Sequence, residues 1–98
     1  MSFDILVVVT TEASGPYLLP LVAAAQRADV SIAVFLTNDG VKLASDQALG
    51  QNLRNMETVV MCAESWSTYL PDEKSPVTSG SQTDHSQMIG SAGVVISL

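Results

Sequence analysis

Four apolar runs, separated by amphipathic or polar stretches, set the pattern of the chain. They cover residues 3–10, 30–37, 57–61 and 94–98. The first reads FDILVVVT and shows no alternation of apolar and polar positions, which is typical of a strand buried on both faces in a parallel sheet. We therefore expect these four runs to form buried strands, and residues 77–79 to form a short additional one.

Apolar residues at helical spacing lie between the predicted strands. They predict an amphipathic helix over residues 17–28 and a second one that starts at Ser45 or Asp46 and ends near Met56. A last helix is expected to begin with Thr83 or Asp84 as its cap. Strands that alternate with helices indicate a single α/β domain, with a mostly parallel sheet of about five strands and helices on both faces.

Three loops are expected to meet at one edge of this sheet, because the carboxyl ends of parallel strands lie together and hold ligands in such folds. They cover residues 11–15, 38–41 and 62–67. The middle loop begins with Asn38-Asp39-Gly40, a strong turn signal because Asn and Gly tolerate positive φ.

Composition narrows the classes of partner. Hydrophobic residues make up 47% of the 98 residues and charged residues 14%, so we expect an apolar face to be buried against other subunits. The net charge of −6 disfavours nucleic acid and anionic membranes as partners. The start of the chain lacks the pattern of a signal peptide, and no apolar run is long enough to span a membrane. A single cysteine excludes an internal disulfide and suggests a reducing cytoplasmic location.

Cys62 is the main candidate for chemistry. It follows the strand at residues 57–61 and precedes a polar loop, where a helix N-terminus would lower the pKa of the thiol and favour the nucleophilic thiolate. The nearby anion Glu64 would act in the opposite direction. The alternative is a cysteine that only packs in the core, as free cysteines often do.

Other polar and aromatic residues have two interpretations each. His85 could act as a base or be an exposed helix residue. Asp39 and Gly40 could be catalytic, although turn chemistry explains both. Trp66 and Tyr69 could line a pocket or form a subunit contact. We expect no metal site and no cofactor, because one His and one Cys make no recognisable metal set and no phosphate-binding loop motif is present.

Three segments resemble the DsrE/DsrF-like sulfur-relay proteins, the group that includes the TusB, TusC and TusD subunits. The segments are AVFLTNDGVKLA (33–44), with its DGV turn after a strand, VVMCAES (59–65), with its cysteine after a strand, and the tail GSQTDHSQMIGSAGVVISL (80–98). The resemblance implies a flavodoxin-like three-layer domain over residues 1–98 that assembles into homo- or hetero-oligomers, as trimers or hexamers.

By position, the resemblance makes Cys62 the residue that accepts sulfur as a persulfide from a donor protein and passes it to an acceptor protein. The loop after the cysteine, AESWSTYLPDEK, departs from the family in being acidic and in lacking the extra cysteine and glycines of several members. Two alternatives therefore stay open beside the sulfur carrier. One is a non-catalytic subunit of the same fold with a buried, inert cysteine, and the other is a small-ligand binder.

Overall fold

The protein folds around one sheet of five parallel strands in the order β4-β3-β2-β1-β5. A computed structural model describes residues 2–98. The strands are β1 (Phe3–Val9), β2 (Ile32–Leu36), β3 (Val59–Cys62), β4 (Thr78–Gly80) and β5 (Ala92–Ser97). The expected class, a flavodoxin-like α/β sandwich with a parallel sheet of five strands, is confirmed.

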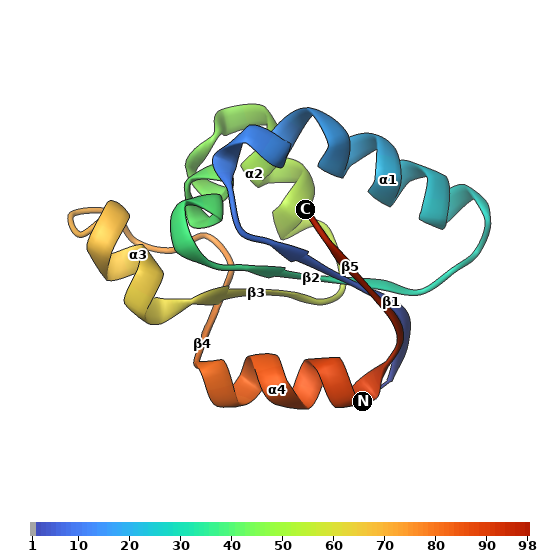
Figure 1. The fold of residues 1–98 in the computed structure, drawn as a ribbon. Coiled ribbons are helices and arrows are strands. Elements are labelled where there is room, and N and C mark those ends of the chain that lie inside the picture. Colours follow the sequence, from blue (N-terminus) through green and yellow to red (C-terminus); the bar gives the residue numbers. More distant parts are fainter. Residues whose placement is uncertain (1) are drawn as a thin grey trace.

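Helices cover both faces of the sheet. α1 (Gly15–Arg27) and α2 (Gln47–Arg54) lie over one face, whereas α4 (Gln82–Ser91) lies over the other (Figure 1). α3 (Ala63–Tyr69) follows β3 at the sheet edge, and two 3₁₀ segments, η1 (Glu12–Ser14) and η2 (Asn38–Ser45), follow β1 and β2.

Alternate residues of the central strands fill two separate cores. Val7 and Val9 of β1 pack in the cluster that includes side chains of α1 and α2, while Leu6 and Val8 pack in the cluster of Met88 on α4. Because β1 has a layer of helices on each side, its buried stretch from Leu6 to Val9 is apolar at every position. The lack of alternation in residues 3–10 thus has the physical cause expected for it.

The last strand differs from its expected burial. Residues 94–98 were predicted to form a buried strand, but β5 pairs only with β1 and lies at the edge of the sheet. Val94 and Val95, on opposite faces of β5, are 56% and 41% exposed. An apolar run predicts a strand, but its hydrophobicity does not show whether the strand has neighbours on both sides.

The start of α4 also differs from expectation. The cap is Ser81 rather than Thr83 or Asp84, and Asp84 is the third helical residue of a capping box. The Ser81 hydroxyl accepts from the Asp84 N–H, and the Asp84 carboxylate accepts from the Ser81 N–H. This earlier start makes Gln82 the first residue of the helix. None of the helices within residues 2–98 combines the length and hydropathy needed to cross a membrane.

Candidate functional site

Cys62 lies where two neighbouring strands send the chain to opposite faces of the sheet. It is the last residue of β3 and pairs in register with Gly80, the last residue of β4. After β3, Trp66 of α3 packs in the core on the α1 and α2 side; after β4, Met88 of α4 packs in the opposite core. Such a switch point opens a crevice beyond the strand ends, which is the usual ligand site of parallel α/β sheets.

A pocket of about 330 Å³ occupies this crevice. The Cys62 side chain lines it but is only 4% exposed, so the thiol is buried in one wall. The predicted loops at 38–41 and 62–67 both contribute to the pocket, and α4 adds Gln82. The loop at 11–15 contacts η2 instead, where Glu12 and Gly15 line a separate depression. The remaining lining residues are Thr37, Asn38, Glu64, Ser65, Thr68 and Tyr69.

One hydrogen-bond donor reaches the sulfur from α3. The backbone N–H of Asn38 donates to Ser65 Oγ over 2.9 Å, so the oxygen serves as an acceptor there and its own hydrogen is free to point at the Cys62 sulfur. Asn38 has a φ of 52°, in the left-handed region that Asn tolerates better than most residues. The turn predicted at 38–40 therefore orients a donor toward the site.

A second donor reaches the sulfur from α4. The Gln82 side-chain amide places Nε2 at 3.4 Å from Cys62 Sγ, and its Oε1 lies 3.1 Å from His85 Nδ1. Sequence reasoning did not identify Gln82. The Ser81-x-x-Asp84 spacing of a capping box was the available signal, since it places Gln82 and His85 three residues apart on one helix face.

The surroundings of Cys62 favour its thiolate. Burial is the largest influence and raises the pKa of the thiol, but hydrogen bonds to the sulfur together outweigh it. They come from the hydroxyl and backbone N–H of Ser65, from the Gln82 amide and from the backbone N–H of Glu64, and the pKa falls below its ordinary value. Glu64, expected to oppose the thiolate through its carboxylate, contributes a favourable backbone N–H.

The two aromatic candidates have separate roles. Tyr69 is 42% exposed and lines the pocket, and the Lys42 ammonium lies 5.2 Å from its ring centroid. Trp66 is buried in the core and neither lines the pocket nor lies at the surface. Its indole N–H donates to the Glu73 carbonyl over 2.8 Å, which anchors the segment that leads to β4.

Gly40 and His85 also differ from the simplest expectations. Gly40 does not adopt positive φ; it is needed because a Cβ there would lie 2.5 Å from the Val9 carbonyl oxygen. His85 is half-buried rather than exposed. Its ring stacks on Phe35 with centroids 4.5 Å apart and planes 9° apart. Asp39 lies outside the pocket lining, and the close approach to Val9 accounts for Gly40.

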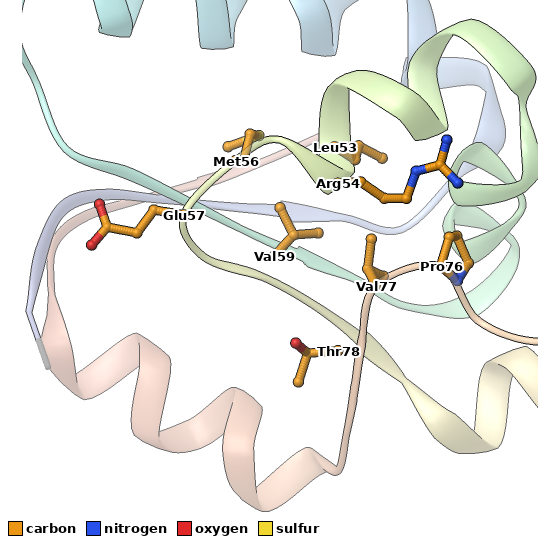
Figure 2. Close-up of a pocket in the computed structure, with 8 residues that line it drawn as sticks. All are labelled: Leu53, Arg54, Met56, Glu57, Val59, Pro76, Val77 and Thr78. Atoms are coloured by element: carbon orange, nitrogen blue, oxygen red, sulfur yellow. The ribbon is translucent and has the colours of Figure 1, made fainter.

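A larger depression of about 390 Å³ lies where β3 and β4 begin (Figure 2). Its wall is built from apolar side chains such as Leu53, Val59 and Val77. Its charged residues are Arg54 and Glu57. They lie at opposite ends of the depression, and their charged groups do not converge on one point. Because this depression is at the amino ends of the strands, away from the usual ligand edge, we place the candidate site at Cys62.

Within residues 2–98, no three His, Cys, Asp or Glu side chains gather in a way that could hold a metal ion. Comparison of the sequence with models of known protein families, and with curated proteins, gives no match.

Proposed function

We propose that this protein is a sulfur carrier of the DsrE/DsrF-like kind, which holds a persulfide on Cys62 and passes the sulfur to a partner protein. The observation that carries the proposal is the convergence of hydrogen-bond donors from α3 and α4 on one sulfur atom beside a pocket. Thiolate, the nucleophilic form of cysteine, is the species that these donors stabilise. The resemblance of residues 33–44, 59–65 and 80–98 to this family supports the same function.

The proposed transfer balances without a further oxidant. The Cys62 thiolate attacks the outer sulfur of a donor persulfide, R–S–SH, and forms a new S–S bond. The donor S–S bond breaks, and its electron pair leaves on the donor thiolate. The proton stays on the transferred sulfur, which is now the outer atom of the Cys62 persulfide. An acceptor thiolate then attacks that atom and releases Cys62 as a thiolate.

Mass spectrometry of the intact protein tests the proposal. After incubation with a low-molecular-weight persulfide and removal of excess donor, we expect the wild-type mass to rise by one sulfur atom. Cyanide treatment, which removes outer sulfur, should reverse the gain. The matched control is Cys62→Ser, which keeps the size of the side chain and should gain nothing. An unchanged wild-type mass, or an equal gain in Cys62→Ser, would contradict the proposal.

A second candidate is a structural subunit of the same fold with an inert cysteine. It is favoured by the 4% exposure of Cys62 and by the exposed apolar side chains of β5. The same incubation separates the candidates. An inert subunit would take up no sulfur, while still sedimenting as an assembly of several copies.

The proposed role includes partners and a location. We propose a trimer or hexamer of this chain or of related chains, and sulfur donor and acceptor proteins in a reducing cytoplasm. The apolar composition, the single cysteine and the unpaired outer edge of β5 support these proposals.

A further inference from the structure

The Gln82 amide can donate to the Cys62 sulfur in only one of its two orientations. Its nitrogen is a donor and its oxygen is an acceptor. With Nε2 at 3.4 Å from the sulfur, Oε1 faces His85 Nδ1 at 3.1 Å, and this nitrogen must carry the hydrogen that closes the contact. A rotated amide would present its oxygen to the sulfur and repel a thiolate. Gln82 is exposed to solvent, so packing alone does not prevent that rotation.

Stacking does not explain why residue 85 is a histidine. The ring lies flat on Phe35, which is fully buried, and this contact fixes the ring position. His85 Nε2, however, is buried without a hydrogen-bond partner among residues 2–98, which is unfavourable for a polar atom. A phenylalanine would stack equally well and bury no unpaired nitrogen. The feature that phenylalanine lacks is the Nδ1–H that reaches Gln82.

We infer that His85 is a positioning residue for Cys62, whose Nδ1–H holds the Gln82 amide so that its nitrogen donates to the sulfur. The relay runs from His85 through Gln82 to Cys62 and acts on the thiolate. Its extension to a persulfide on Cys62 rests on the proposed function. Other titratable groups lie around α4 and the pocket. On α4, the Asp84 carboxylate accepts hydrogen bonds from Ser81. On α3, Glu64 and Tyr69 line the pocket. On β1, the Asp4 carboxylate accepts a hydrogen bond from the Ser31 N–H.

Two substitutions of His85 separate positioning from packing. His85→Phe keeps the stacked ring and removes the donor, whereas His85→Asn keeps an N–H near the position of Nδ1 and loses the ring. The thiolate of Cys62 is measured by its ultraviolet absorbance as a function of pH, with Cys62→Ser subtracted. Thermal unfolding gives the stability of each variant.

For His85→Phe we expect the titration midpoint to move to higher pH, with roughly three- to tenfold less thiolate at a pH below both midpoints. Its thermal stability should equal or exceed that of the wild type. For His85→Asn we expect the midpoint to return toward the wild-type value while the stability falls. A purely structural histidine predicts the reverse pattern, with a normal midpoint in His85→Phe, and that result would overturn the inference.

A substitution at Gln82 provides an independent check. Gln82→Met removes the amide from an exposed side chain and should give the same midpoint shift as His85→Phe. Combining the two should add little further, because both interrupt one relay. If His85→Phe does not fold, Gln82→Met still decides, since an unchanged midpoint there overturns the relay.

The outcomes remain distinct from those of the proposed function. A shifted midpoint in a protein whose wild type takes up no sulfur supports the relay and rejects the sulfur carrier. Uptake of sulfur by the wild type, together with an unshifted midpoint in His85→Phe, supports the carrier and rejects the role of His85.

Discussion

At the scale of single residues, the state of Cys62 depends on which atoms point at its sulfur. The thiol is buried, which alone would favour the neutral form. Ser65 supplies the leading opposing contribution, through both its hydroxyl and its backbone N–H. Asn38 orients the hydroxyl by donating to its oxygen. Removing one hydroxyl should therefore change the protonation of a different residue.

Ser65→Ala tests this dependence. We expect the pH titration of the Cys62 thiolate to move to higher pH, with roughly three- to tenfold less thiolate at a pH below both midpoints, because one hydrogen bond to a charged group is lost. The control is Ser67→Ala, an exposed position on the same short helix. Ultraviolet absorbance of the thiolate measures both variants. Equal titrations of Ser65→Ala and wild type would contradict the role of the hydroxyl.

Sequence reasoning identified the thiol but not the residues that control it. Cys62 was evident because it is the only cysteine and follows an apolar run. Its main donors, Ser65 and Gln82, are 17 residues apart and meet only because β3 and β4 are neighbours. Glu64 illustrates the same limit, since its charge is visible in the sequence whereas the direction of its backbone N–H is not.

At the scale of elements, the apolar runs and the helical spacings predicted most of the fold, and the short strand expected at 77–79 is observed as β4 at Thr78–Gly80. The helix at 17–28 and the strands at 3–10, 30–37 and 57–61 all lie within a few residues of their observed positions. α3 and β4 have seven and three residues, too few for periodicity to distinguish helix from strand. Their positions depend on long-range contacts such as the Trp66 anchor.

Two glycines with opposite surroundings test the packing of these elements. A Cβ at Gly40 would lie 2.5 Å from the Val9 carbonyl oxygen, whereas a Cβ at Gly90 would meet no atom of residues 2–98 within 4 Å apart from its chain neighbours and the nearby backbone of α4. We expect Gly40→Ala to lower the free energy of unfolding by about 1–3 kcal/mol, because η2 must move away from β1.

Gly90→Ala should raise the free energy of unfolding by about 0.5–1 kcal/mol, because alanine favours the helix. Urea unfolding of both variants measures the difference. A Gly40→Ala protein as stable as Gly90→Ala would show that the approach of η2 to β1 is not tight.

At the scale of the whole molecule, strand order creates the site. β1, β2, β3 and β4 are added in one direction across the sheet, and the chain then crosses the opposite face through α4 to place β5 beside β1 (Figure 1). This reversal brings α4, with Gln82 and His85, to the end of β3. The apolar runs predict a parallel sheet but not the order of its strands, because buried strands of similar composition do not reveal which strand lies beside which. The exposed edge position of β5 was missed for the same reason.

The stability of the whole protein should depend on the ionisation of Cys62. The pKa of this thiol lies below its ordinary value of 9.0 in the folded protein, because hydrogen bonds to the sulfur outweigh burial. Below the folded-state pKa, the thiol is protonated in both states and contributes nothing that varies with pH. Between that pKa and 9.0 the unfolded chain binds more protons than the folded protein, so stability rises with pH.

The contribution should be complete above pH 9.0 and should be lost as the pH falls through the folded-state pKa. We therefore expect the free energy of unfolding of wild type, minus that of Cys62→Ser, to increase as the pH rises from the folded-state pKa to 9.0 and then to level off. Taking the difference removes groups that titrate equally in both proteins. Urea unfolding at a series of pH values measures it. A difference that falls as the pH rises would mean that burial dominates and that the site favours the neutral thiol.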